Sequence, residues 1–259
     1  MPRDKTAPIK EMFTSQFKEG YLVEGDASQL EWKVAAYLSQ CPTMIEEILN
    51  GVDQHQKVRE ELFNNKVDRV IAKIYNFRMI YGGSPYSFFR DIKMPNYSLK
   101  KWEEINKAFY EKYSGLKRWH DELYRDIYRN NGEMKNITGR LFKLDKFETR
   151  NGMEYRFPQV VNYPVQSLAT ADIIPLAMVE IRKKLLHLYP NRGRMVLQVH
   201  DSVLYDVENR EVADEVAKVM LNTFDQLPKL FEKYFNVPFN VPLGGEVKMG
   251  KNWLEMVKI

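Results

Sequence analysis

The segment that most constrains the fold is VLQVHDSVLYDV, residues 196–207. Two runs rich in β-branched residues, 196–199 and 203–207, flank the polar triplet His200-Asp201-Ser202. This pattern is typical of a strand, a tight turn and a returning strand. It predicts a buried hairpin with Asp201 at its tip and the Asp201 carboxylate directed outward at one end.

A second segment has the same character. YLVEGDASQLEWKVAAYLS, residues 21–39, begins as an apolar strand that runs into Asp26 and continues as a helix from about Gln29 to Ser39. Each aspartate alone could be a turn residue or a helix N-cap. Two carboxylates at the ends of adjacent strands could instead hold divalent metal ions, because hard cations such as Mg²⁺ prefer oxygen ligands.

Length and composition set broad limits. The 259 residues suffice for one large or two modest domains, and the formal net charge of +4 is compatible with nucleic acid without being specific for it. The single cysteine, Cys41, excludes an intramolecular disulfide and fits a reducing compartment. No signal-peptide pattern follows Met1, and no apolar run approaches the roughly 20 residues of a membrane span. We therefore expect a soluble cytoplasmic protein without a membrane partner.

Helical patterns dominate the middle of the chain, and strand patterns cluster at both ends. We expect a short helix from Thr43 to Asn50-Gly51, and further helices over 53–66, 67–81, 98–130 (one helix, or two broken near Gly115), 164–188 (kinked at Pro175) and 209–235. Strand patterns cover 135–144 and 154–160, with Asn151-Gly152 as a hairpin signal. The arrangement predicts a mixed α+β sheet domain with a helical insertion.

The predicted helix 67–81 carries Arg69, Lys73, Phe77 and Tyr81 at every fourth position. Successive members are offset by about 40°, so they share one slowly drifting face. This could be an ordinary amphipathic helix with a solvated basic edge. It could also lie along a nucleotide, with the two cations on the phosphates and the two rings beside the sugar and base.

Three further candidates have equally plain alternatives. Glu31 lies on the first turns of the helix after Asp26 and could be a solvated carboxylate, and His55 and His200 could be structural histidines. Zinc-ligand spacing, a P-loop and a serine-hydrolase elbow are all absent from the sequence.

Taken together, these segments resemble the three polymerase motifs of family A DNA polymerases, the DNA polymerase I type. The motifs are GDASQLEWKVAAYLS, DRVIAKIYNFRMIYGG and QVHDSV, in that order. Further matches are DQH at 53–55, TGR at 138–140, N-x-P-x-Q at 162–166, ADII after it, and GKNW near the end. PRDKTAPIKEMF and YGGSPYSFF look most like the bacteriophage branch.

The resemblance implies a polymerase palm, an antiparallel sheet with packed helices, and an inserted helical fingers subdomain. The first part of the palm is expected over 1–40, the fingers over 41–131 and the second part of the palm over 132–259. It also implies a template-directed DNA polymerase that adds dNTPs to a primer 3′-OH by two-metal phosphoryl transfer.

Roles follow position by position from the same resemblance. Asp26, Asp201 and the backbone carbonyl of Ala27 would bind two Mg²⁺ ions, for which Mn²⁺ could substitute. The incoming nucleotide would be bound by Arg69, by Lys73 as general acid on the pyrophosphate, by His55, Phe77 and Tyr81, and by Ala27, Ser28 and Gln29. Glu31 would be the steric gate against a ribose 2′-OH, and Asn162, Gln166 and His200 would contact primer–template DNA.

Two departures from the family pattern stand out. Ser202 occupies the position where the family often has a glutamate after the second aspartate. The thumb and exonuclease domains that the family places earlier are not found in this sequence, so a separate polypeptide carrying the thumb, with or without an exonuclease, is the expected partner. The alternatives are a catalytically incomplete fragment that binds nucleotide or primer–template, and an unrelated metal-dependent hydrolase.

Overall fold

The computed structural model describes residues 9–150 and 152–259, which divide into two compact units. The first unit contains the described residues up to Leu30 together with Ala169–Ile259, and the second contains Glu31–Leu168. The start of the PRDKTAPIKEMF match and Asn151 of the hairpin signal lie outside the described residues. Each unit is taken by itself below.

The borders of the two units differ from the predicted borders at 40/41 and 131/132. Trp32, just after Leu30, packs edge-on against Tyr113 with ring centroids 5.4 Å apart, which ties this helix to the second unit. At the other border, Phe157 packs against Tyr124 at 5.3 Å. Residues 31–40 and 132–168 therefore share a core with 41–131.

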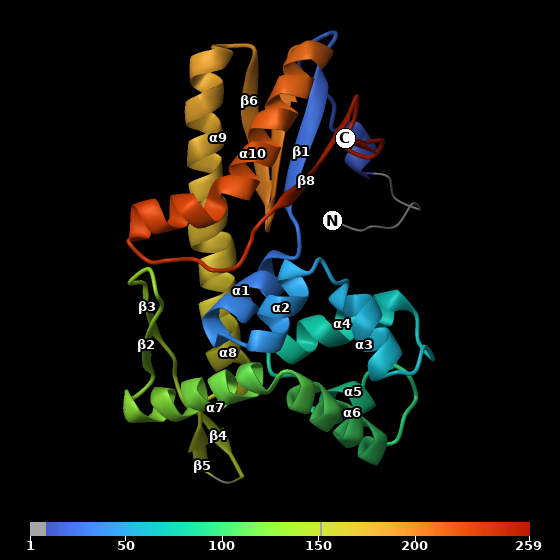
Figure 1. The fold of residues 1–259 in the computed structure, drawn as a ribbon, viewed down its shortest axis with the longest axis vertical. Coiled ribbons are helices and arrows are strands. Elements are labelled where there is room, and N and C mark those ends of the chain that lie inside the picture. Colours follow the sequence, from blue (N-terminus) through green and yellow to red (C-terminus); the bar gives the residue numbers. More distant parts are fainter. Residues whose placement is uncertain (1–8, 151) are drawn as a thin grey trace. The chain divides into compact units, whose positions relative to one another are not determined.

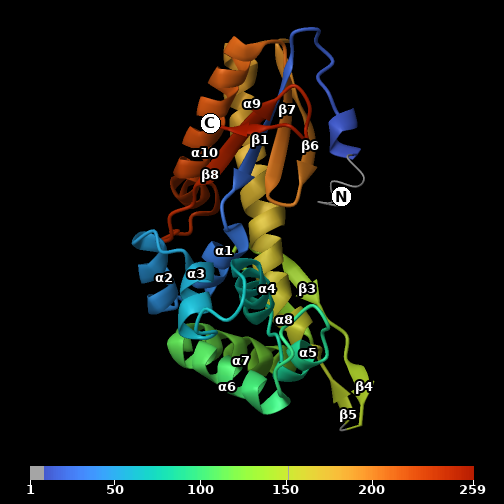
Figure 2. The same cartoon turned by 90° about the vertical axis from the view of Figure 1, so that its right-hand side faces the viewer.

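The first unit is built on an antiparallel five-stranded sheet in the order β6-β7-β1-β8-β9. The strands are β1 (Tyr21–Ala27), β6 (Gly193–Val199), β7 (Ser202–Val207), β8 (Gly245–Gly250) and β9 (Val257–Lys258). Helices α9 (Ile174–Leu188) and α10 (Arg210–Phe235) cover one face of the sheet (Figures 1 and 2). A short 3₁₀ helix, Ile9–Met12, precedes β1.

The predicted hairpin over 196–207 is confirmed. Strands β6 and β7 pair up to Val199 opposite Ser202, leaving His200 and Asp201 as the turn. Every residue of β7 is buried, whereas β6 lies at the edge of the sheet and is largely exposed. The predicted helix 209–235 is confirmed as α10, which the Asn209 side chain caps by accepting from the Val212 N–H at 3.0 Å.

The period of two along β1 decides which way its side chains point. A side chain at Gly25 would meet the Phe224 ring of α10 at 2.9 Å, so this position faces the helices. Glu24 is on the opposite face, where its carboxylate accepts from Trp253 Nε1 at 2.9 Å. Asp26, two positions after Glu24, therefore projects from the face of the sheet that α10 leaves uncovered.

The second unit is mainly helical (Figure 1). Its helices are α1 (Leu30–Ser39), α2 (Pro42–Leu49), α3 (Gln54–Glu61), α4 (Arg69–Ile80), α5 (Pro85–Phe89), α6 (Leu99–Lys112), α7 (Ser114–Arg129) and α8 (Phe157–Gln166). Two small hairpins pair β2 (Glu133–Lys135) with β3 (Leu141–Lys143) and β4 (Phe147–Thr149) with β5 (Gly152–Glu154).

An aromatic core holds these helices together. The rings of Phe88 and Trp102 stack at 5.1 Å, and Tyr75 of α4 lies 5.0 Å from Phe88. Tyr75 is fully buried, and its hydroxyl donates to Asn106 Oδ1 at 3.0 Å. This packing fixes which face of α4 points inward.

Several element predictions were wrong in detail. Of the predicted strand 154–160, only Glu154 lies in a strand, at the end of β5. Phe157 and Pro158 already begin α8. The predicted start of a helix at Pro164 lies inside α8, and Ser167–Ile173 form a π-helical segment before α9. Pro175, near the start of α9, has no N–H to donate to a carbonyl of the preceding turn. This missing hydrogen bond accounts for the irregular helical segment Ser167–Ile173 just before it.

Two other helix boundaries also differ. Cys41 rather than Thr43 occupies the N-cap of α2, with Pro42 at its first turn. The 53–66 pattern contains a helix only over α3. The alternative of two helices over 98–130, broken near Gly115, is confirmed, since α6 and α7 meet at Tyr113.

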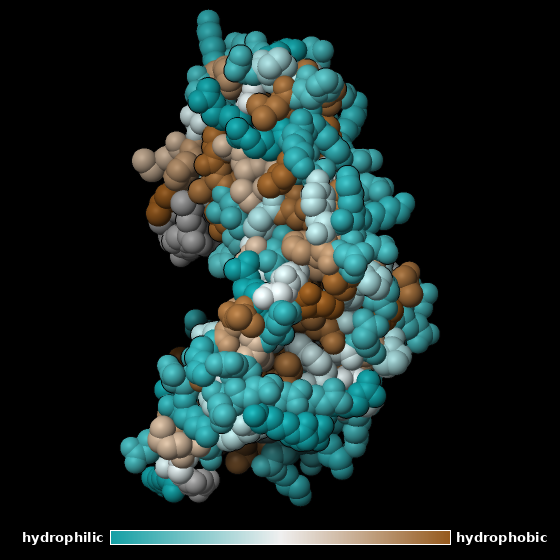
Figure 3. Space-filling view, turned by 90° about the vertical axis from the view of Figure 1, so that its left-hand side faces the viewer, coloured by the Kyte–Doolittle hydropathy of each residue, from teal (hydrophilic) through white to brown (hydrophobic). Residues whose placement is uncertain are grey.

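The helical run Phe157–Leu188 is long and apolar enough to cross a membrane, by length and composition alone. The core helix of a soluble protein passes the same test, and 56% of the most apolar stretch of this run is buried. The sequence prediction that no run of this kind exists was therefore wrong on composition. Figure 3 shows exposed hydrophobic side chains in small patches separated by hydrophilic ones.

Candidate active site

The two predicted metal-binding aspartates lie close together at one end of the β1–β7 pair, Asp26 on β1 and Asp201 in the turn that precedes β7. In the pairing of β1 with β7, Asp26 lies opposite Ser202, and the Ala27 N–H donates to the backbone carbonyl of Asp201 at 3.0 Å. Asp201 itself lies in the turn after β6. The sheet thus brings together residues 175 positions apart in sequence (201 − 26).

The backbone around the two aspartates is unusual. His200, in the turn, has a φ of +54°, and Gln29, after β1, has a φ of +56°. Non-glycine residues adopt this left-handed region rarely, and such residues cluster at functional sites. Ser28 continues the pairing of β1 with β8 beyond the strand ends, because its N–H donates to the Gly244 carbonyl at 3.0 Å.

Ser202 does not take over the metal-binding role expected of the glutamate that the family often has at this position. Ser202 is buried, and its hydroxyl donates to the Val199 carbonyl at 3.1 Å, within the hairpin. The serine therefore closes the turn and adds no acidic oxygen to the site.

The Asp26 carboxyl lies in strongly unfavourable surroundings for a negative charge. Burial, followed by repulsion from Asp201, Glu24 and Glu246, raises its pKa to about 7, and Lys248 offsets only part of this. Glu246 is directly opposite Asp26 in the pairing of β1 with β8. A divalent cation beside Asp26 would relieve this repulsion, which is the electrostatic requirement of a cation site.

The donor set fits Mg²⁺ with few protein ligands. Among residues 9–150 and 152–259, no group of three or more His, Cys, Asp or Glu side chains is placed to hold a metal ion. Mg²⁺ is commonly bound by one or two carboxylates together with substrate phosphates and water. Asp26 and Asp201, with the Ala27 carbonyl, match that kind of site better than a closed protein cage.

The predicted nucleotide-binding residues of α4 share one partly exposed face. Arg69 is exposed and Lys73, Phe77 and Tyr81 are half-buried, while the buried face carries Ala72, Tyr75, Asn76, Met79 and Ile80. Lys73 Nζ lies 5.7 Å from the centre of the Phe77 ring. The ring of His55, from α3, is 5.9 Å from the same ring.

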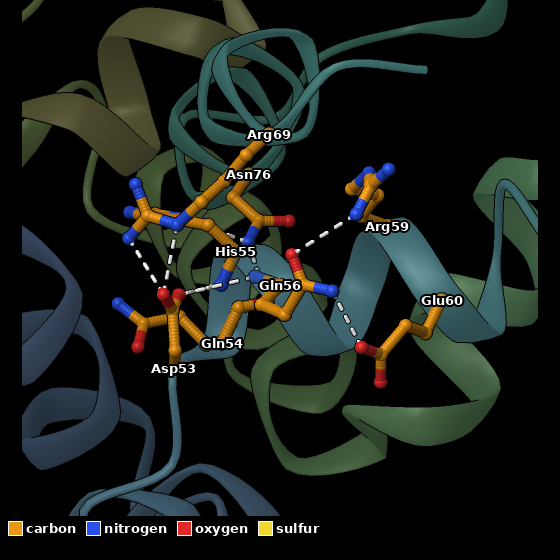
Figure 4. A network of polar contacts seen from close by, with 8 residues as sticks. All are labelled: Asp53, Gln54, His55, Gln56, Arg59, Glu60, Arg69 and Asn76. Carbon is orange, nitrogen blue, oxygen red and sulfur yellow. Dashed lines mark hydrogen bonds and ion pairs between the residues drawn. The ribbon is translucent and has the colours of Figure 1, made fainter. Parts of the chain in front are cut away.

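Arg69 is held by Asp53, a residue that the sequence reasoning did not single out (Figure 4). Its Nε and Nη2 atoms lie 2.8 and 2.7 Å from Asp53 Oδ2. The other oxygen, Oδ1, caps α3 by accepting from the N–H groups of His55 and Gln56, both at 3.0 Å. Burial acts to raise the pKa of the Asp53 carboxyl, but the Gln56 N–H and Arg69 outweigh it and lower that pKa.

His55 is buried and fixed by Asn76 (Figure 4). Asn76 Nδ2 donates to the Gln54 carbonyl at 3.2 Å and lies 3.0 Å from His55 Nδ1. The Gln54 oxygen can only accept, which sets the orientation of the amide, so Nδ1 must also accept. The neutral ring therefore carries its proton on Nε2.

Electrostatics supports a neutral His55. Burial, Arg69 and Lys73 lower its pKa to about 4, against a raising effect of Asp53. At pH 7 the ring can thus donate one hydrogen bond through Nε2–H and adds no positive charge of its own.

The remaining predicted residues fall in both units. Tyr81 at the end of α4 accepts a hydrogen bond from Gln166 Nε2 of α8 at 2.5 Å, and Asn162 is half-buried on the same helix. Glu31 lies in the first turn of α1. His200 is exposed at the turn of the first unit.

Four residues of these surroundings were not predicted from the sequence. Asp53 could have been found, because D-x-x-Q at a helix start, here Asp53 to Gln56, is an N-cap signal. Asn76, Glu24 and Glu246 carry no such signal, since their importance depends on tertiary contacts.

The model of DNA polymerase family A matches residues 2–255 of this chain. The chain belongs to DNA polymerase family A. It is 31% identical to DNA polymerase I of Caldicellulosiruptor bescii over 90% of this chain and 27% of that protein, and 28% identical to DNA polymerase I of Lactococcus lactis subsp. lactis over 92% and 26%. The chain thus spans about a quarter of the length of these curated relatives.

The fold agrees with the family. The POL domain of Pol1 from M. smegmatis, solved in complex with DNA primer-template and dNTP, superposes with a TM-score of 0.82 and 24% identity. The similarity covers 98% of this chain and 44% of that one. It confirms the predicted α+β fold with an antiparallel sheet and packed helices.

The surroundings of Asp26 predict a pH-dependent stability effect in the absence of metal. Because the folded pKa is raised from 3.8 to about 7, folding favours the protonated carboxyl, and this advantage is lost as pH rises through 7. After allowance for solvent screening, we expect Asp26→Asn in EDTA to be more stable than wild type by about 1–2 kcal/mol at pH 8. The gain should shrink as pH falls toward 4, measured by urea unfolding.

Asp225→Asn is the matched control, because Asp225 is an exposed carboxylate on α10 of the same unit. Its stability should stay within about 0.5 kcal/mol of wild type. A pH-independent difference between Asp26→Asn and wild type would contradict the electrostatic explanation.

The contact between Asn76 and His55 predicts a single histidine tautomer. ¹⁵N NMR should show His55 with an unprotonated Nδ1 and a protonated Nε2, without titration between pH 6 and 8. In Asn76→Ala, Nδ1 loses its donor, so both tautomers should be populated and the His55 pKa should rise.

Asn106→Ala serves as control, because it removes another buried asparagine of the same unit that contacts Gly83 and Tyr75 instead of His55. It should leave the tautomer unchanged. The assignment fails if His55 of the wild type carries its proton on Nδ1.

Proposed function

We propose that this chain forms the palm and fingers of a template-directed DNA polymerase that adds dNTPs to a primer 3′-OH. The observation that carries the proposal is the convergence of Asp26 of β1 and Asp201 of the turn before β7 in a chain of DNA polymerase family A. The first unit corresponds to the palm and the second to the fingers, with the helices α1 and α8 included in the second.

Asp26, Asp201 and the Ala27 carbonyl would hold two Mg²⁺ ions, or Mn²⁺ in their place. When bound, the ions lower the pKa of the attacking primer hydroxyl and stabilise the charge on the leaving pyrophosphate. The protein's own contribution is to keep two carboxylates side by side and partly shielded from water, where their repulsion favours a cation.

In the fingers, the α4 face supplies charge for the triphosphate. Arg69 exchanges its contact with Asp53 for a phosphate, Lys73 neutralises charge and donates a proton to the pyrophosphate, and His55 donates through Nε2–H. Phe77 packs beside the sugar, and Ser28 and Gln29 continue the nucleotide contact from the palm.

Primer–template DNA would be contacted by Asn162, Gln166 and His200, with Tyr81 beside the templating position. Contacts of this kind go to the backbone and the minor groove, so binding should tolerate any sequence. The similar fold of a Pol1 domain solved with DNA primer-template and dNTP supports this arrangement.

A thumb completes the polymerase in this proposal, and we place it on a separate polypeptide, with or without an exonuclease. We propose a cytoplasmic location, in the cytoplasm of a host cell if the chain comes from a bacteriophage, as the resemblance of PRDKTAPIKEMF and YGGSPYSFF suggests. The relatives named above are bacterial.

Replacement of Asp201 tests the proposal directly. Primer extension by this chain, supplied with a thumb-bearing polypeptide, should fall by about 10³-fold or more in Asp201→Ala, because one of the two carboxylates is lost. Asp225→Ala, which removes an exposed carboxylate of α10, should extend at the wild-type rate.

Equal extension by Asp201→Ala and wild type would reject the catalytic role. If no partner restores incorporation by the wild type with either Mg²⁺ or Mn²⁺, while the chain still binds dNTP or primer–template, the chain is instead a catalytically incomplete binding fragment.

Replacement of Glu31 tests the choice of sugar. Glu31→Ala should raise ribonucleotide incorporation on the order of 100-fold, because the space for a 2′-OH opens. Glu46→Ala, an exposed glutamate of α2, should leave the ratio of deoxyribonucleotide to ribonucleotide incorporation unchanged. Unchanged selectivity in Glu31→Ala would argue against the gate.

A further inference from the structure

The two oxygens of the Asp53 carboxylate serve two different contacts (Figure 4). Oδ2 lies 2.8 Å from Arg69 Nε and 2.7 Å from Arg69 Nη2. Oδ1 accepts from the N–H groups of His55 and Gln56, both at 3.0 Å, and so caps α3. The ion pair and the helix cap can therefore be separated by a substitution that keeps an N-cap acceptor and removes the charge.

The ion pair between Asp53 and Arg69 lies at the surface. The Arg69 side chain is 49% exposed and the Asp53 side chain is 42% exposed. Exposed ion pairs of this kind contribute little to stability, so the contact can open at small cost. Asp53 keeps its place when the pair opens, because the N–H groups of α3 still hold Oδ1.

Only one of the two cations on this face of α4 carries such a counter-ion. Lys73, one turn after Arg69, makes no ion pair or hydrogen bond with any residue of 9–150 and 152–259. Its ammonium group lies 5.7 Å from the centre of the Phe77 ring. In the proposed nucleotide site, a phosphate can thus approach Lys73 directly, whereas at Arg69 it meets Asp53 first.

Asp53 and a phosphate are alternatives for the same edge of the Arg69 guanidinium. A planar guanidinium binds a carboxylate and a phosphate in the same way, through a pair of N–H groups. The pair formed by Nε and Nη2 is occupied by Asp53. A phosphate that takes this edge must displace Asp53 Oδ2, and it then lies beside an anion.

We propose that Asp53 is the exchange partner of Arg69 and hastens the departure of pyrophosphate, the product of the reaction proposed above. The inference rests on that proposed function and deepens it. A bound dNTP also has sugar and base contacts with the face of α4, which offset the competition from Asp53. Pyrophosphate has only its phosphate contacts, so the return of Asp53 to Arg69 favours its release. Asp53 is a positioning residue, because it acts through Arg69 and not on the reacting atoms.

Removal of the Asp53 charge is the test. Isothermal titration calorimetry measures the binding of pyrophosphate and of dTTP to the full chain, in EDTA at constant ionic strength and without DNA. Asp53→Asn keeps an acceptor for the N-cap and should bind both ligands about fivefold more tightly than wild type, because no carboxylate competes for Arg69. Stopped-flow measurement should show slower dissociation of pyrophosphate, since changes in affinity within one site appear mainly in the dissociation rate.

Asp53→Ser is the second variant. A serine also caps a helix, and it presents no group to Arg69, so binding of both ligands should again become tighter. A merely structural role of Asp53 would have the opposite effect, since a frayed α3 or a badly placed Arg69 would weaken binding. The sign of the change therefore distinguishes the two roles.

Asp91→Asn is the matched control. Asp91 pairs with Arg78 of the same helix α4, and its Oδ1 accepts from the Lys93 N–H at 2.8 Å. Arg78 lies nine positions after Arg69 (78 − 69), which places it about 180° around the helix. The affinities of Asp91→Asn for pyrophosphate and dTTP should stay within about twofold of wild type.

A double variant isolates the contact. In an Arg69→Gln chain, Asp53 has no arginine to hold, so adding Asp53→Asn should change the affinity for pyrophosphate by less than about twofold. Unchanged or weaker pyrophosphate binding in Asp53→Asn or in Asp53→Ser overturns the inference. A fivefold gain that persists in the Arg69→Gln chain does so as well.

Failure of the proposed function would look different. Arg69→Gln and Lys73→Gln would then bind pyrophosphate and dTTP as wild type does, or wild type would bind neither ligand. Either result rejects the nucleotide site on α4, and this inference with it.

Discussion

The antiparallel pairing of β1 with β7 is the constraint on which the rest of the structure depends. It sets Asp26 opposite Ser202 and joins Ala27 to the Asp201 carbonyl. A shift of one residue would turn Asp26 toward α10, where Phe224 and Met220 already fill the space above Gly25. The register that buries the apolar side chains is therefore the same register that exposes the acidic pair.

This arrangement stores electrostatic cost at the site. Asp26 faces Asp201, Glu24 and Glu246, and burial adds to the repulsion, so its carboxyl resists ionisation until about pH 7. A fold selected for stability alone would replace at least one of these groups by a neutral residue. The cost is understandable if a divalent cation and a nucleotide bring the missing positive charge and the remaining ligands.

The second unit prepares its cationic face in a different way, through contacts that fix each side chain before any ligand binds. Asp53 both caps α3 and holds Arg69, and Asn76 sets the tautomer of His55. Asn76 leaves its own Oδ1 without a partner in the described residues, at a cost of about 1–3 kcal/mol. A rigid donor at His55 reduces the freedom lost on binding a phosphate.

Local patterns account for what the sequence could predict, and tertiary contacts account for what it could not. The hairpin 196–207 and the drifting face of 67–81 depend on periods of two and about four residues, and both were found. The start of α8 was missed because a proline such as Pro158 is found both at the end of a strand and in the first turn of a helix, so it does not distinguish the two. The borders of the two compact units could not be read from the sequence, because Trp32 and Phe157 belong to a core that only their distant ring partners reveal. The same distinction separates Asp26, visible as a strand-end carboxylate, from Glu246, whose effect on it exists only once β8 has paired beside β1.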